Sequence, residues 1–185
     1  MKTAYSYDNI VLTPKYSEIK SRSKLDTSVE FLGKKFKSVA IPANMKCTID
    51  FKKAIELSEA GYFYVLHRFY NYDAIYNWVS ENQDLKTISI SVGVNEKDWD
   101  LINDLFVNKL RVDYITIDVA HGHHILVKEM IEHIKNHHFK NSAKIIAGNI
   151  GTVDAAMDLK SWGADAVKVG LSMGKSCTTY NCTGV

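Results

Sequence analysis

The last stretch of the chain, VGLSMGKSCTTYNCTG, holds residue types that could carry out nucleophilic chemistry. In it, Cys177 follows a glycine-rich segment and precedes two threonines. A free cysteine has a pKa near 8.5, so little of it is thiolate at neutral pH unless amides or cations lower that value. The loop N–H groups and Lys175 could do so. The competing interpretation is an ordinary small loop residue, because most cysteines have no catalytic role.

Other polar residues follow apolar runs that have the composition of strands. In a parallel barrel the chemistry lies at the carboxyl ends of the strands, so residues at these places would share one mouth. The positions are Asn44, His67 with Arg68, Asp118 with His121, Asn149, and residues 172–177.

The elements that must position these residues follow a regular order, in which apolar runs alternate with helical patterns. The runs predict about six strands, at residues 39–45, 62–66, 87–92, 114–120, 144–150 and 166–171. The patterns between them predict five helices, at residues 51–60, 73–81, 97–108, 125–138 and 153–162, of which the first and last end at Gly61 and Gly163.

Apolar strands separated by single helices predict an α/β fold with a parallel sheet, either doubly wound or a barrel. The ring of polar residues favours a (β/α)8 TIM barrel. Since a complete barrel takes roughly 250 residues, we expect one incomplete barrel domain over residues 1–185. It would consist of an N-terminal segment, 1–38, and βα units 1 to 6 over 39–185.

Composition narrows the class of partner. The 23 basic and 21 acidic residues are scattered and give a net charge of +2, so we expect neither nucleic acid nor a membrane surface as partner. There is no signal-like start and no apolar run of about 18 residues, which predicts a cytoplasmic protein. In a reducing compartment, Cys47, Cys177 and Cys182 are not expected to form disulfides.

The loop VGLSMGKSCTT resembles the active-site loop of the IMP dehydrogenase and GMP reductase family, in which a nucleophilic cysteine is followed two positions later by a threonine. The resemblance covers essentially the whole chain and includes, in the family's order, SYDNIVLTP, KSRSKLDT, IPANM, FYVLHRF, SISVGV, YITIDVAHGH and IIAGNIGT. Few residues separate Glu81 from Thr87, where most IMP dehydrogenases insert regulatory modules, and this favours the reductase side.

The resemblance implies a NADPH-dependent reductive deamination of GMP to IMP and ammonia, as in purine nucleotide salvage. Cys177 would add to C2 of the purine and form a thioimidate as the 2-amino group leaves, and NADPH would then reduce C2. Thr179 would help to move protons during ammonia departure. The alternative role for Thr179 is a loop-capping hydroxyl.

The resemblance also implies contacts to the dinucleotide and a monovalent cation. Arg68 stands where other reductases carry lysine; arginine binds phosphates but cannot carry protons. Each arginine has a surface or salt-bridge role as its alternative. Loop carbonyls would form a potassium site at Ser172, Gly174 and Cys177, although Ser172-Met173 replaces the Gly-Pro of many relatives. The cofactor-binding set would be Ser21, Arg22, Arg68, Asp118, Val119, Ala120, Leu171 and Ser172.

Several alternatives stay open. Metal binding by the histidines at 121, 123, 124, 137 and 138 lacks a completing carboxylate or cysteine, and solvent-facing or supporting roles are favoured. The chain could be an IMP dehydrogenase fragment that oxidises IMP to XMP with NAD, or a non-catalytic fragment that associates with other subunits. Family relatives imply a homotetramer, and we expect the 185-residue chain alone to have little activity.

Overall fold

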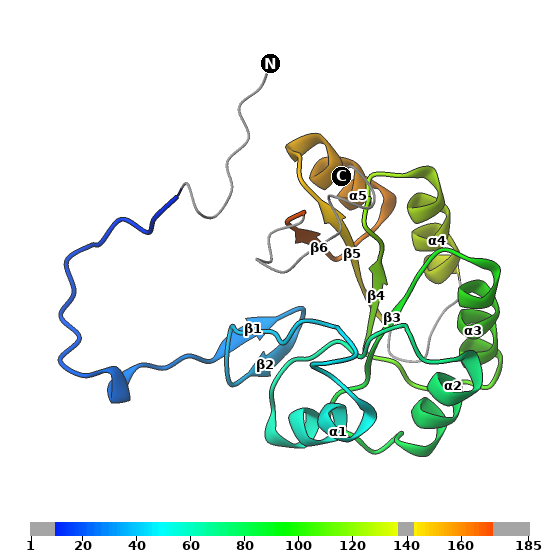
Figure 1. Cartoon of the computed structure of the whole chain (residues 1–185), viewed down its shortest axis with the longest axis horizontal. Coiled ribbons are helices and arrows are strands. Elements are labelled where there is room, and N and C mark those ends of the chain that lie inside the picture. The colour runs from blue at the N-terminus through cyan, green and yellow to red at the C-terminus, as the bar shows by residue number, and fades with distance from the viewer. Residues whose placement is uncertain (1–9, 137–142, 172–185) are drawn as a thin grey trace.

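The computed structural model describes residues 10–136 and 143–171, and its centre is a parallel sheet in the order β3-β4-β5-β6. One helix follows each of the first three strands, which confirms the predicted α/β class (Figure 1). The strands are β3 Ser89–Val92, β4 Tyr114–Asp118, β5 Lys144–Ile150 and β6 Ala166–Val169; the helices are α1 Phe51–Ala60, α2 Tyr72–Glu81, α3 Glu96–Val107, α4 Ile125–Asn136 and α5 Val153–Trp162. No helix within the described ranges is both long and apolar enough to cross a membrane.

Local capping signals explain where the helices begin and end. The Asp50 side chain accepts a hydrogen bond from the Lys53 amide at the start of α1, and Gly61 ends this helix in the left-handed conformation with φ 80°. Gly163 ends α5 in the same way, with φ 111°. The predicted stops at Gly61 and Gly163 are therefore confirmed.

The N-terminal half differs from the six-strand prediction. Residues 39–45 form no strand: Val39, Ile41 and Met45 are exposed, and the chain turns directly after the segment, where the Thr48 and Ile49 amides donate to the Met45 carbonyl. The run at 62–66 contributes a single parallel bridge, Leu66 to Ile90, instead of a full strand. An apolar run becomes a strand only where a neighbouring strand satisfies its backbone groups, and these runs lack that neighbour along most of their length.

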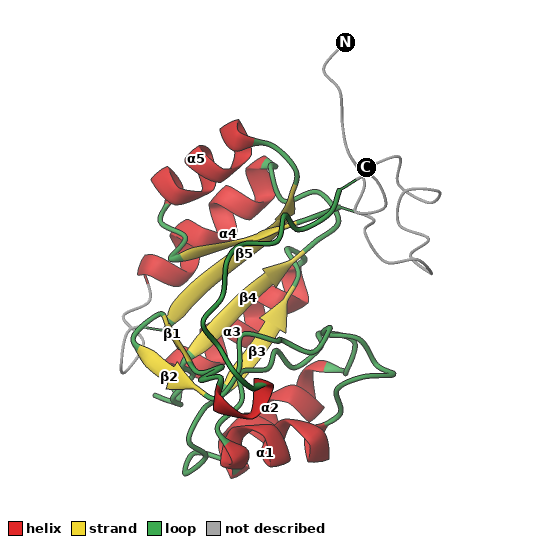
Figure 2. Cartoon of the chain, turned by 90° about the vertical axis from the view of Figure 1, so that its left-hand side faces the viewer, coloured by secondary structure: helices red, strands yellow, loops and turns green. Residues whose placement is uncertain are grey.

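A β-hairpin in the segment expected to be irregular was not predicted. It consists of β1 Val29–Phe31 and β2 Lys34–Phe36, joined by Leu32 and Gly33, both with positive φ. Figure 2 shows the hairpin in front of the sheet, on the side opposite to α4 and α5. Upstream of it, residues 10–28 form an arm that runs away from the body (Figure 1).

The sheet separates two apolar clusters. The larger cluster lies between the strands and the helices and includes the fully buried Ile90, Ile115, Ile117 and Met130. Because side chains alternate along a strand, Tyr114, Thr116 and Asp118 point to the opposite face. On that face the hairpin contributes to the smaller cluster, whose buried members are Phe36, Phe63, Val65, Tyr114 and Ile146.

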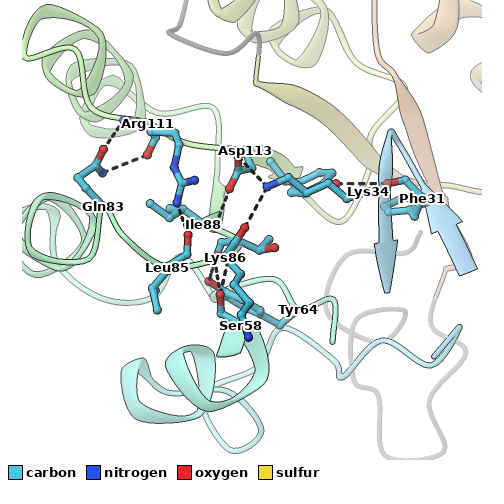
Figure 3. Close-up of polar contacts among 12 residues, drawn as sticks. Phe31, Lys34, Ser58, Tyr64, Gln83, Leu85, Lys86, Ile88, Arg111 and Asp113 are labelled. Atoms are coloured by element: carbon cyan, nitrogen blue, oxygen red, sulfur yellow. Dashed lines mark hydrogen bonds and ion pairs between the residues drawn. The ribbon is translucent and has the colours of Figure 1, made fainter. Parts of the chain in front are cut away.

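Polar contacts attach the hairpin to the beginnings of the strands (Figure 3). The Lys34 ammonium lies 2.9 Å from Asp113 Oδ1, immediately before β4, and donates to the Lys86 carbonyl at 3.1 Å, just before β3. Asp113 Oδ2 accepts from the Ile88 amide at 2.8 Å. The amino ends of the strands are thus closed by the hairpin and held by one exposed and one half-buried hydrogen bond together with the Lys34–Asp113 ion pair.

Candidate functional site

The carboxyl end of the sheet brings together four polar side chains from distant parts of the sequence. Asp118, the last residue of β4, is contacted by Lys168 from β6, whose Nζ lies 3.0 Å from Asp118 Oδ1. The same ammonium lies 3.0 Å from Asn44 Oδ1. On the other side, Arg68 Nε donates to the Asp118 carbonyl at 2.9 Å. An acidic residue is therefore held by one cation at its side chain and by another at its main chain.

Asn149, in β5, fixes the loops beside this group. Its amide N–H donates to the Val119 carbonyl at 2.7 Å, and its side-chain Nδ2 donates to the Gly170 carbonyl at 2.9 Å. Its own carbonyl accepts from the Gly122 amide at 2.7 Å, and a Cβ at Gly122 would lie 2.8 Å from that oxygen. The segment after Asp118 is consequently anchored to β5, and through β5 to the loop after β6.

His67 lies buried beside Arg68 and is 1% exposed. Its Nδ1 accepts a hydrogen bond from the Phe69 amide at 3.1 Å, and its ring stacks on Tyr70 with centroids 4.4 Å apart. Burial, together with the positive charge of Lys46, lowers the pKa of His67 below its ordinary value. At neutral pH this imidazole is therefore uncharged and fixes the loop that presents Arg68.

Arg68 also lines a cleft of about 840 Å³ at the beginnings of α2 and α3. A volume of this size suits a nucleotide-sized ligand. Asp98 also lines the cleft, but both of its carboxylate oxygens already accept hydrogen bonds, from the amides of Gly93 and Asn95 at 2.8 and 3.0 Å. Burial and a hydrogen bond to Asp104 raise the pKa of the Tyr72 hydroxyl. Other polar lining residues are Asn71, Asp73, Lys97, Asp100 and Asn103.

The structure brings together part of the predicted site. Arg68, Asp118, Val119 and Ala120 lie at the carboxyl end of the sheet. Leu171 follows β6, and its Cδ1 would lie 2.9 Å from a Cβ placed on Gly151.

Two predicted cofactor-binding residues are not part of this group. Ser21 and Arg22 belong to the exposed arm, where the Ser21 hydroxyl accepts from the Ser23 amide. The predicted Ser172, Gly174, Cys177 and Thr179 lie outside the described residues.

Lys168 is the residue of this group that sequence reasoning missed. Its partners lie 50 and 124 positions away in the sequence, so no local pattern could pair them. The available signal was the composition of the run AVKVGL, in which one lysine stands within an otherwise apolar strand. A charged residue there requires a partner.

The histidines after β4, which were candidates for a metal site, and the described cysteine, Cys47, make their contacts outside the group around Asp118. His123 Nε2 lies 2.8 Å from Asp158 Oδ2. His124 Nδ1 accepts from the Leu126 amide at 3.2 Å, at the start of α4. Over residues 10–136 and 143–171, no cluster of three or more His, Cys, Asp or Glu side chains could hold a metal ion. His137 and His138 fall outside those ranges, and Cys47 is an exposed free thiol.

Comparisons with known proteins agree on one family. The family model described as "IMP dehydrogenase / GMP reductase domain" matches residues 4–185. GMP reductases from Leptothrix cholodnii and Mesoplasma florum are 45% and 47% identical over 97% and 98% of this chain, and over 54% and 56% of their own lengths. The GMP reductase of Bacillus subtilis is 44% identical over 100% of the chain and 56% of its own length.

A solved structure has the same fold. The inosine 5′-monophosphate dehydrogenase from Legionella pneumophila aligns with a TM-score of 0.80 and 28% identity, over 99% of this chain and 55% of that one. The chain therefore spans about half the length of the curated relatives and of the solved structure that it matches.

Proposed function

The chain belongs to the IMP dehydrogenase / GMP reductase family, and from this premise we propose that the protein acts as a GMP reductase, which converts GMP to IMP and ammonia with NADPH. One observation carries the choice of reaction. Relatives named GMP reductase match at 43 to 48% identity over nearly the whole chain. The connection between α2, which ends at Glu81, and β3, which begins at Ser89, is short, and this supports the reductase over a dehydrogenase with inserted modules.

The proposed chemistry rests on Cys177 as nucleophile. Its thiolate sulfur bonds to C2 of the purine, and the C2–N bond to the 2-amino group breaks. Ammonia departs with a proton that Thr179 helps to deliver, because an amide anion is a poor leaving group. After reduction of the resulting thioimidate at C2, the C–S bond breaks and IMP and the thiolate are released. One nucleophile thus divides a difficult substitution into easier steps.

NADPH, when bound, supplies the hydride for C2. The described residues that would hold it suit a phosphorylated dinucleotide: Arg68 offers a permanent positive charge at the edge of the cleft, and Asp118 offers a carboxylate for donor groups. Val119, Ala120 and Leu171 are further proposed contacts to the dinucleotide. Ser21 and Arg22 remain proposed contacts, without support from their position on the arm.

We also propose that the fold is a (β/α)8 barrel to which β3 through β6 contribute four consecutive parallel strands. The support is the ladder of parallel pairs, the helix between each strand and the next, and the TM-score of 0.80 to the Legionella enzyme. The polar group at the carboxyl ends is where a barrel of this kind carries its chemistry.

A second candidate reaction is the oxidation of IMP to XMP with NAD. The Legionella structure favours it, since its name describes an IMP dehydrogenase. An assay in both directions separates the two: NADPH consumption with GMP indicates the reductase, and NADH formation with IMP and NAD indicates the dehydrogenase.

The deciding experiment measures GMP-dependent NADPH oxidation and compares Cys177→Ala with Cys47→Ala. Because the chain spans 54 to 56% of its curated relatives, it should be assayed alone and joined to the C-terminal part of the Bacillus subtilis relative. We expect Cys177→Ala to lower kcat by about a thousandfold or more. The exposed Cys47 provides the matched control, whose loss should leave kcat unchanged. Equal activity in both variants would refute the proposed nucleophile.

A further inference from the structure

Three residues at the carboxyl end of the sheet lie in one row across three strands. In the register of the sheet, Asp118 of β4 pairs with Gly148 of β5, and Gly148 pairs with Lys168 of β6. Neighbouring strands lie about 4.8 Å apart, so the outer two backbones of the row are separated by about 10 Å. The Lys168 ammonium nevertheless lies 3.0 Å from Asp118 Oδ1. The lysine side chain therefore crosses over β5.

Gly148 makes this crossing possible. A Cβ at position 148 would lie 2.5 Å from the Lys168 carbonyl oxygen and 2.7 Å from the Lys168 Cβ. Both distances are shorter than any that real side chains adopt, and the first involves backbone that cannot move aside. A side chain on the middle strand would thus displace Lys168 from the row.

The position of the Lys168 ammonium indicates that it orients the Asp118 carboxylate and adds little to folding stability. The Lys168 and Asp118 side chains are 38% and 17% exposed, and partly exposed ion pairs add little to folding stability. An ammonium has three donors, and two of them point to Asp118 and Asn44, which fixes its place at the mouth. Arg68 holds the main-chain carbonyl of Asp118, so Lys168 is the group that sets the direction of the carboxylate.

We infer that Lys168 is a positioning residue, which extends over Gly148 and orients the Asp118 carboxylate toward the bound nucleotide. The ammonium contacts Oδ1 of Asp118, and we assign Oδ2 of Asp118 as the acceptor for a donor group of the ligand. This role rests on the proposed function, because it presumes that Asp118 contacts substrate or cofactor. Lys168 itself acts through Asp118.

A double-mutant cycle on kcat/KM tests the inference. We expect Lys168→Met to lower kcat/KM at least tenfold in the chain joined to the C-terminal part of its relative. It should have no further effect when Asp118 is already Asn. Lys168→Arg keeps a cation at the end of a long side chain and should recover part of the loss. The exposed Lys160 of α5 provides the control, because Lys160→Met removes an equal charge away from the row. Losses that multiply in the double variant would overturn the inference.

A measurement without ligand separates this inference from the proposed function. In the 185-residue chain with 13C-labelled aspartate, Lys168→Met should shift the side-chain carboxyl resonance of Asp118, whereas Lys160→Met should not. If this shift is seen but the wild-type chain joined to the C-terminal part of its relative shows no GMP-dependent NADPH oxidation, the reductase is refuted and the orientation of Asp118 by Lys168 stands. An unchanged resonance would refute the orientation whatever the activity. Gly148→Ala should produce the same shift. If Gly148→Ala does not fold, the Lys168→Met result alone decides between the outcomes.

Discussion

The two ends of the parallel sheet are built from opposite kinds of residue. At the amino end, Phe31, Phe36, Phe63 and Tyr114 form a ring cluster, with Phe63 centred 5.1 Å from both Phe31 and Tyr114 in edge-to-face geometry. At the carboxyl end, Arg68 and Lys168 lie within hydrogen-bonding distance of Asp118, and Lys168 also contacts Asn44. A single strand contains both extremes, since β4 begins with Tyr114 and ends with Asp118.

Along β4, the side chains that point away from the helices become more polar and more exposed from the amino end to the carboxyl end. Tyr114 and Thr116 are both 1% exposed, whereas Asp118 is only partly buried. The Thr116 hydroxyl and that of Ser89 on β3 have no hydrogen-bond partner among the described residues. Under the proposed function, this difference is a division of roles, in which the amino end supplies stability and the carboxyl end supplies chemistry, at some cost in stability. Substitutions at the two ends should therefore affect different measurements.

The largest effect is expected at the amino end, for Phe63→Ala. Phe63 is 2% exposed and contacts three other rings, so its truncation should lower the free energy of unfolding by about 3–5 kcal/mol. Urea unfolding measures the change. Phe69→Ala is the matched control, because Phe69 is 49% exposed and loses mainly its cation–π contacts with Lys46 and Arg68, so it should lower the free energy of unfolding by about 1 kcal/mol or less. Equal losses in the two variants would contradict the division of roles.

The second effect belongs to the carboxyl end. Asp118→Asn keeps the size of the side chain and removes its charge, so it should weaken binding of the nucleotide by about 10- to 150-fold, the equivalent of 1.5–3 kcal/mol for a hydrogen bond to a charged group. Titration of the protein with NADPH and with GMP measures the change. The urea midpoint should move little. If Asp118→Asn binds nucleotide as the wild type does but has a lower urea midpoint, Asp118 contributes stability instead of binding, and the division of roles is wrong.

The contrast between the ends also explains how far the fold could be predicted. The helices were found because their limits depend on local residues, such as Asp50 before α1 and Gly61 after it. The strands β3 to β5 were found because strands buried on both faces form continuous apolar runs. β6 was found from its apolar composition, although its residues are only partly buried or exposed. The hairpin was missed because its strands have three residues each and β2 is rich in lysine. Gly33, at the turn between them, was the one local signal.

The candidate site was predictable only where its residues follow an apolar run. Asp118 and Arg68 follow such runs, and both lie at the carboxyl end of the sheet. The crossing of Lys168 over Gly148 depends on sheet register, which no local pattern contains. Residues 39–45 were predicted as a strand from composition alone, although backbone pairing with a distant neighbour decides that outcome.

A smaller effect at the amino end is expected for Tyr114→Phe. The change keeps the ring in its cluster and removes the hydrogen bond that the hydroxyl donates to the Phe31 carbonyl at 3.2 Å. Burial raises the pKa of this hydroxyl to about 12, so the hydroxyl stays protonated and can donate throughout the neutral pH range. The free energy of unfolding should fall by about 0.5–1.5 kcal/mol. Tyr16→Phe, at a side chain that is 89% exposed, should leave it unchanged, and kcat/KM should be unaffected by both.

The smallest effect concerns pH and the carboxyl end. Because burial and Lys46 lower the pKa of His67 in the folded state, the unfolded chain binds this proton more readily. The stability contributed by neutral His67 is complete above about pH 6.5, the ordinary value for histidine, and is lost as the pH falls through the lower folded value. Urea midpoints measured between pH 5 and 7.5 should therefore decline less steeply for His67→Gln than for the wild type. Equal slopes in the two proteins would mean that the lowered pKa of His67 does not reduce the stability of the folded chain in acid.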